Sequence, residues 1–113
     1  MTLVYDVLKE AVEKHRCVVM AAEGQRREVA PLAIGFKDAR QMVLTFQYKG
    51  GSNSGLAEGG AWRCFPIDHI DWAKITDDPW QHGNYPIAKV EASFDNILYG
   101  MGAQMRTYQH KRR

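Results

Sequence analysis

Two arginines, Arg27 and Arg63, are the side chains in this sequence best suited to bind a charged ligand. Each shares the alternation of apolar neighbours in a predicted strand, and each lies near an end of that strand. A guanidinium group presents a planar fork of N–H donors that matches a phosphate or a carboxylate in a bidentate way. The pair therefore predicts a site for an anionic group.

Four polar or aromatic side chains from the same region complete the candidate ligand-binding site: Gln47, Tyr48, Trp62 and His69. Aromatic rings stack on nucleobases while arginine takes the phosphate charge, as in proteins that bind single strands. These residue types predict a nucleotide-like ligand or a single-stranded nucleic acid. In the alternative, the arginines form rim ion pairs worth only ~0–1 kcal/mol, with Glu28, Asp68 or Asp71 as partners.

Residue types that are typical of catalysis or metal binding form no recognisable motif. Cys64, His69 and His82 lack the spacing of a closed zinc site, and no GxSxG motif surrounds Ser52 or Ser54. No GxxxxGK[ST] sequence is present, so a phosphate-cradling P-loop is not supported. The sequence therefore predicts a binding protein that is not an enzyme and needs no cofactor. An unrecognised hydrolase is the less favoured alternative.

Length and composition are those of one globular domain spanning residues 1–113, with 45% hydrophobic residues. The net charge of +2 is too balanced to indicate nucleic-acid binding by itself. Cys17 and Cys64 form no CxxC pair, and the N-terminus does not resemble a signal peptide. No apolar run approaches the ~20 residues of a membrane helix. We therefore expect a cytoplasmic protein with reduced thiols and no membrane contact.

The elements that must position the candidate site are predicted to be a helix, five short strands and a second helix. Apolar residues at helical spacing predict the first helix at about 3–15. Short alternating or apolar segments, separated by turns that contain Gly and Pro, predict a small β-barrel at about 17–76. Helical spacing of apolar residues predicts a C-terminal helix at about 90–101, followed by a basic tail at 104–113. The predicted class is mainly β with flanking helices (α+β).

The centre of this predicted barrel is a strand, a loop and a second strand over residues 41–70. The first strand is predicted to have one apolar face, made by the members of one parity: Met42, Leu44, Phe46 and Tyr48. Pro66 has no N–H donor, which predicts a free edge or a bulge. Residues 49–61 include five glycines, so they form either a flap over a ligand or a flexible connection, and both remain open.

Four segments carry a resemblance to a known family: VLKEAVEKHRCVVM, REVAPLAIG, MVLTFQY and WRCFPIDHIDWAKI. Over residues 4–80 the chain resembles the WYL domain family. That family's Trp-Tyr-Leu triplet falls on Met42-Val43-Leu44, and its Phe-x-Leu-Asp-Arg-Ile stretch falls on residues 65–70, where His69 replaces the arginine. The resemblance implies a partly open, SH3- or Sm-like barrel after a helix. It also implies a stand-alone regulatory domain that senses a nucleotide-like ligand or nucleic acid, as in transcription regulation.

A protein–protein interaction or homo-oligomerisation module is the main alternative function. Four apolar residues near the C-terminus could form an exposed stripe and a dimer contact, or they could pack in the core: Tyr99, Met101, Met105 and Tyr108. Three further aromatic residues are predicted to be buried in the core or in a lid: Trp72, Trp80 and Tyr85.

Overall fold

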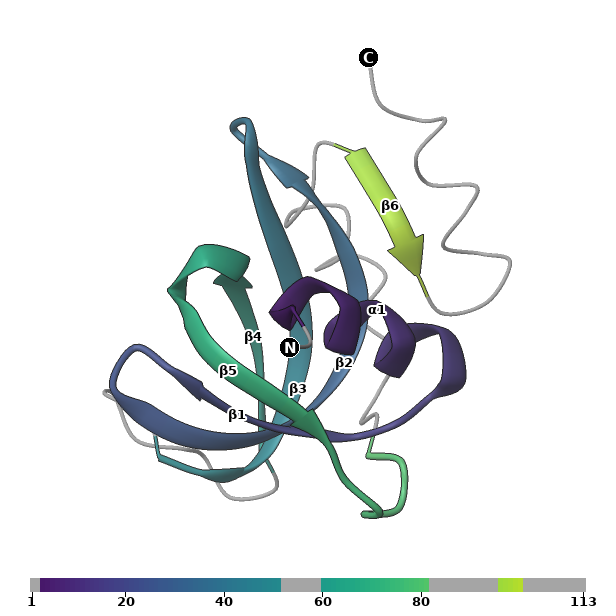
Figure 1. Cartoon of the computed structure of the whole chain (residues 1–113), viewed down its shortest axis with the longest axis vertical. Coiled ribbons are helices and arrows are strands. Elements are labelled where there is room, and N and C mark those ends of the chain that lie inside the picture. The colour runs from purple at the N-terminus through teal and green to yellow at the C-terminus, as the bar shows by residue number, and fades with distance from the viewer. Residues whose placement is uncertain (1–2, 52–59, 82–95, 101–113) are drawn as a thin grey trace.

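A computed structural model of the chain describes residues 3–51 and 60–81 and the backbone of residues 96–100. In chain order the elements are α1 (Val4–Lys14), β1 (Val18–Ala22), β2 (Gln25–Lys37), β3 (Arg40–Gly50), β4 (Ala61–Pro66), the 3₁₀ turn η1 (Ile67–His69), β5 (Ile70–Ile75) and β6 (Asn96–Gly100) (Figure 1). The predicted class, α+β and mainly β, is confirmed. No helix in the described ranges is long and apolar enough to cross a membrane.

The strands form one antiparallel sheet in the order β4-β3-β2-β1-β5, and β6 pairs with β2 beside this path. The sheet is strongly curved, so that β5 and β1 cross in front of β3 and β4 in Figure 1. Its pairing ends at β4 on one side and at β5 on the other, and the sheet is therefore not closed. The two ends are joined through η1, which leads directly from β4 to β5.

Strand β2 has two different partners along one of its edges. Residues 25–29 pair with β1, and residues 33–36 pair with β6. Pro31 lies between these stretches, so its missing N–H removes no hydrogen bond to either partner. The strand continues through Pro31, with a shift of register against β3 between Pro31 and Ala33.

The helix α1 supplies one wall of the main core. Its apolar stripe is buried against residues of five strands, and the combined cluster contains Val7, Leu8, Ala11, Val12, Val18, Met20, Val29, Ile34, Val43, Phe65 and Ile70. Full burial of a side chain such as Leu8, which is 0% exposed, contributes about 1.5–3 kcal/mol. We call the sheet face that belongs to this cluster the inner face and the opposite one the outer face.

The predicted C-terminal helix is wrong where the structure describes it. Residues Asn96–Gly100 form the strand β6, in which Tyr99 pairs with Ile34 and Ile97 with Gly35. Ile97 and Tyr99 belong to residue types that also favour strands, so the helical spacing of the apolar residues does not fix the conformation. The free edge of β2 decides it, because tertiary pairing overrides local preference. The remainder of that predicted helix and the basic tail at 104–113 lie outside the described residues, as do Met101, Met105 and Tyr108.

Strand β3 packs on both of its faces, and the predicted apolar face is one of them, with Leu44 0% exposed. Val43, Thr45 and Gln47 have the parity of the inner face, and each is 0% exposed. The opposite parity packs in a second cluster on the outer face, where Phe46 and Tyr48 contact a group made of Cys17, Ala30, Leu32, Trp62 and Trp80. Both faces of β3 are therefore covered, and its more polar face is the one inside.

Candidate functional site

The structure divides the six predicted ligand-binding residues among three places. Arg27 and Gln47 lie on the inner face, and Arg63 has the parity of the inner-face residue Phe65. Tyr48 and Trp62 belong to the outer-face cluster. The sixth, His69, ends η1 at the rim. The sheet thus separates the two arginines from the aromatic rings predicted to act with them.

Arg27 is buried, with 2% of its surface exposed, and its donors are directed at protein groups. Its Nε donates to the carbonyl oxygen of Ala22 at 3.1 Å, and its Nη1 donates to Oε1 of Gln47 at 3.1 Å. Its Nη2 lies 3.7 Å from Oε1 of Glu23, and its guanidinium carbon lies 4.9 Å from the ring centroid of Phe65. These contacts make Arg27 a part of the core rather than of an open rim.

The pKa of Arg27 reflects its burial and the two charged groups near it. Burial lowers the pKa of Arg27, the carboxylate of Glu23 opposes that shift, and the nearby charge of Arg63 adds to it. The two arginines are therefore close enough for their charges to repel each other. Glu23 is the acid that pairs with Arg27, whereas the alternative prediction named Glu28, Asp68 or Asp71.

Gln47 links the inner face to the beginning of the 49–61 segment. Its Nε2 donates to the carbonyl oxygens of Lys49 at 3.2 Å and Gly51 at 2.9 Å. The amide of Gly51 in turn donates to the carbonyl oxygen of Arg26 at 2.9 Å. Residues 52–59, which make up most of the predicted flap or flexible connection, lie outside the described part of the chain.

A chain of polar contacts surrounds His69 at the rim. Its Nδ1 lies 3.2 Å from Oε2 of Glu23, and its Nε2 lies 3.2 Å from Nη2 of Arg40, which also contacts Asp68 at 3.1 Å. Arginine can only donate, so Nε2 accepts and the proton is on Nδ1, directed at Glu23. Arg40 and Asp68 also line an open cavity of about 320 Å³, together with Ala39, Gln41 and Ile67. Among the described residues, no three His, Cys, Asp or Glu side chains are grouped to hold a metal.

The aromatic residues of the outer-face cluster pack against one another and against other protein groups. The hydroxyl of Tyr48 donates to Oδ2 of Asp78 at 2.7 Å; burial first, and then this bond, raise the pKa of Tyr48. The ring of Trp62 lies 5.0 Å from that of Phe46 in a tilted arrangement. Trp80 packs there as predicted, and Tyr85 lies outside the described residues.

A different aromatic residue is open to solvent. Trp72 is 45% exposed and, within the described ranges, is one of two exposed large apolar side chains, the other being Leu3. The prediction that Trp72 is buried is therefore wrong. A sequence signal existed, because Trp72 and Lys74 share one parity of β5 while the partly buried Ala73 and Ile75 share the other.

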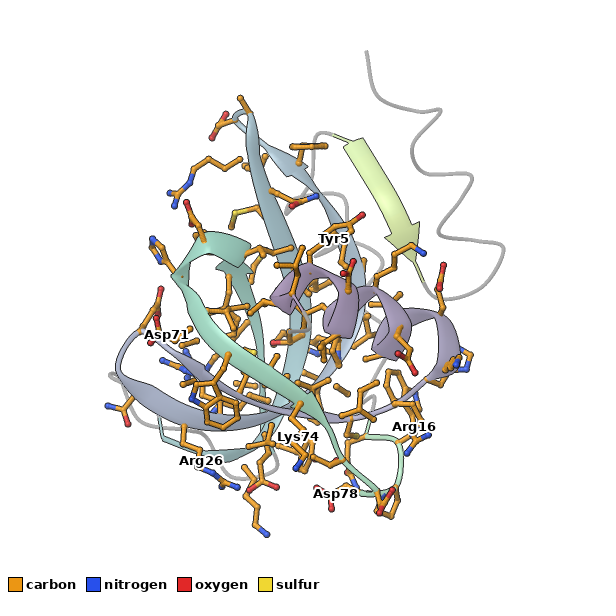
Figure 2. The ribbon with its side chains drawn as sticks, in the orientation of Figure 1. Tyr5, Arg16, Arg26, Asp71, Lys74 and Asp78 are labelled. Carbon is orange, nitrogen blue, oxygen red and sulfur yellow. The ribbon has the colours of Figure 1, made fainter. Side chains whose placement is uncertain are left out.

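The strand register places three basic residues on the same face of the sheet as Trp72. Ala21 of β1 pairs with both Trp72 and Arg26, so these three form a row across the outer face. The next row is Lys74, Val19, Glu28 and Lys49. Figure 2 shows Arg26 and Lys74 on the same side of the molecule, with Asp71 at the other end of β5. We call Trp72, Lys74, Arg26, Glu28 and Lys49 the outer-face patch.

The patch combines one open indole with an excess of positive charge. Arg26, Lys49 and Lys74 are exposed, whereas the side chain of Glu28 is 16% exposed and lies 3.5 Å from Nη1 of Arg26. Neighbouring strands are ~4.8 Å apart, so the backbones of Trp72 and Arg26 lie about 10 Å apart. Ala21, which lies between Trp72 and Arg26 in this row, has a small side chain and fills little of the space between their side chains.

Comparisons with family models, with curated proteins and with solved structures found no match to this chain. The WYL resemblance therefore gains no support from them and stays a prediction.

Proposed function

We propose that this protein is a non-enzymatic module that binds single-stranded nucleic acid, or a nucleotide-like part of one, on its outer-face patch. The observation that carries the proposal is the exposed ring of Trp72, which shares one face of the sheet with Arg26, Lys49 and Lys74. Stacking of a base on such a ring contributes ~1–3 kcal/mol, and the flanking cations attract phosphates. Both contacts are available from one side.

The inner-face arginines support this ligand class less well than the patch does. The donors of Arg27 are directed at Ala22, Gln47 and Glu23, and its side chain is buried. The rings of Tyr48 and Trp62 lie on the other side of the sheet, so they cannot stack on a base whose phosphate is held at Arg27. We therefore move the proposed contact from the predicted residues to the outer-face patch.

We further propose that the fold is a partly open, SH3- or Sm-like barrel and that its role is regulatory, as the WYL resemblance implies. Support for the barrel comes from the order of elements, in which one helix precedes five antiparallel strands and η1 joins β4 to β5. The strong curvature of the sheet in Figure 1 agrees with it.

A fluorescence anisotropy titration with labelled 12-nucleotide single strands tests this function. We expect Trp72→Ala to weaken binding about 5- to 150-fold, the range that ~1–3 kcal/mol of stacking implies. Leu3→Ala is the matched control, because it removes the other exposed large apolar side chain among the described residues. Equal affinity of wild type and Trp72→Ala would exclude the patch as the binding surface.

Self-association through β5 is the second candidate function, because this edge strand carries the exposed Trp72. Against it, β5 has a register irregularity opposite Ala21 and Ala22, and it carries exposed Asp71 and Lys74. Bulges and charged side chains are devices that prevent edge strands from pairing. Light scattering over a hundredfold range of protein concentration distinguishes the two, since self-association predicts a mass that rises with concentration.

A further inference from the structure

We infer that Gln47 is a positioning residue for the outer-face patch: from the inner face, it holds the β-bulge that turns Lys49 toward the ligand. This inference rests on the proposed function and adds a residue that touches no ligand. It also gives a role to a fully buried amide that the patch itself does not explain.

The bulge follows from the register of β2 against β3. Val29 pairs with Gln47, but the preceding residue Glu28 pairs with Lys49, so Tyr48 is the extra residue. Without the bulge, Gln47 and Lys49 would share one face, because they have the same parity. With it, Lys49 stands opposite Glu28 on the outer face, in the same patch as Arg26.

The side chain of Gln47 closes this bulge with hydrogen bonds. Its Nε2 donates to the carbonyl oxygen of Lys49 at 3.2 Å and to that of Gly51 at 2.9 Å. Its Oε1 accepts from Arg27 at 3.1 Å, which fixes the orientation of the amide. The buried amide of Gln47 thus uses all its hydrogen-bonding groups. Its two donors bond the backbone on either side of Gly50, and its acceptor bonds Arg27.

The backbone that Gln47 holds is locked against β2 as well. The amide of Gly51 donates to the carbonyl oxygen of Arg26 at 2.9 Å. Gly50 has a φ of 100°, and a Cβ added there would lie 2.5 Å from the same carbonyl oxygen and 2.8 Å from Cα of Arg27. Lys49 and Arg26, which are two of the three cations of the patch, are therefore fixed to each other through a hydrogen bond that Gln47 supports.

The test compares Gln47→Glu with Lys49→Ala in titrations of a 12-nucleotide single strand over a range of salt. Gln47→Glu keeps an acceptor for Arg27 but replaces both donors to Lys49 and Gly51 by an oxygen that faces their carbonyl oxygens. For each phosphate that the protein no longer neutralises, the slope of log affinity against log salt falls by about 0.7. We expect this fall in both single variants and no further fall in the double variant, because both act through one side chain.

Thr45→Val is the control for a general change in the inner face. Thr45 lies two residues before Gln47 on β3, and its replacement removes the hydrogen bond from Oγ1 to the carbonyl oxygen of Arg63 on β4 without touching the bulge. Its salt slope should equal that of the wild type. If Gln47→Glu does not fold, Gln47→Asn makes the same comparison, since the shorter amide cannot reach the same three partners.

The outcomes separate the inference from the function on which it rests. No binding of the single strand by the wild type would overturn both. Binding by the wild type with an unchanged slope in the folded Gln47 variant would overturn the inference alone, as would effects on the slope that add in the double variant. A reduced slope in Thr45→Val as well would show a non-specific effect and also overturn it.

Discussion

Replacement of Arg27 by alanine is the sharpest test of the buried polar core. The substitution removes a guanidinium group that is 2% exposed and that donates to Ala22 and Gln47. It leaves the carbonyl oxygen of Ala22 and Oε1 of Gln47 in the interior without this donor. It also removes the ring contact with Phe65 and one of the contacts of Glu23, which keeps His69 beside it.

The expected magnitude follows from these interactions. Each buried acceptor that loses its donor costs ~1–3 kcal/mol, so the two together cost ~2–6 kcal/mol. The side chain of Glu23 is 39% exposed, so the loss of its contact with Arg27 adds little to this cost. We expect Arg27→Ala to lower the free energy of unfolding by about 2–6 kcal/mol. That is a large part of the ~5–15 kcal/mol typical of a domain.

Urea unfolding monitored by tryptophan fluorescence measures this difference. Arg26→Ala is the matched control, since Arg26 is the adjacent residue of the same strand but is exposed, and its side chain pairs with Glu28 at the surface. We expect the control to change stability by no more than ~0.5 kcal/mol. If the two variants are equally stable, the hydrogen bonds assigned to Arg27 do not support the fold, and the inner-face network is wrong.

Two further predictions concern the outer-face cluster. The pKa of Tyr48 is raised by burial and by its bond to Asp78, so the folded state keeps the phenol neutral above the ordinary tyrosine pKa of about 10. Stability should therefore be insensitive to Tyr48 below pH ~10 and fall as pH rises beyond it; Tyr48→Phe should remove part of that fall in urea titrations, and an identical fall in both proteins would contradict the assignment. Burial likewise raises the pKa of Cys17, so in a Cys64→Ser background its thiol should react with a disulfide reagent only after unfolding, and fast reaction of the native protein would refute its burial.

The elements with strong local signals could be predicted from the sequence. The apolar stripe of Val7, Leu8, Ala11 and Val12 predicts a helix at 3–15, and α1 spans Val4–Lys14. Polar residues at 37, 38 and 40 favour a turn, and one is present there, with positive φ at Asp38 and Ala39 between paired Lys37 and Arg40. Such features depend on residues close together in the chain, so local periodicity and turn chemistry are sufficient to find them.

The features that depend on distant partners could not be predicted in this way. Residues 96–100 become a strand because they pair with residues 33–36 of β2, far earlier in the chain. Gln47 is inside because Arg27 and the backbone at Gly51 satisfy its amide, which no alternation of hydrophobicity shows. The outer-face patch likewise depends on registers that bring Trp72 beside Ala21 and Arg26. The residues of the candidate site are therefore neighbours across strands, and they are not neighbours along the chain.

The divided edge of β2 has a consequence for solubility. Ala33, Ile34, Gly35 and Phe36 form the stretch that β6 covers, and the first three of them are buried. Uncovered, this stretch would present unpaired backbone groups beside apolar side chains, a combination that favours pairing with other chains. Strand β6 therefore covers an aggregation-prone edge of β2 that the other four strands of the sheet leave unpaired. Protein that lacks residues 96–100 should aggregate before its remaining five strands unfold.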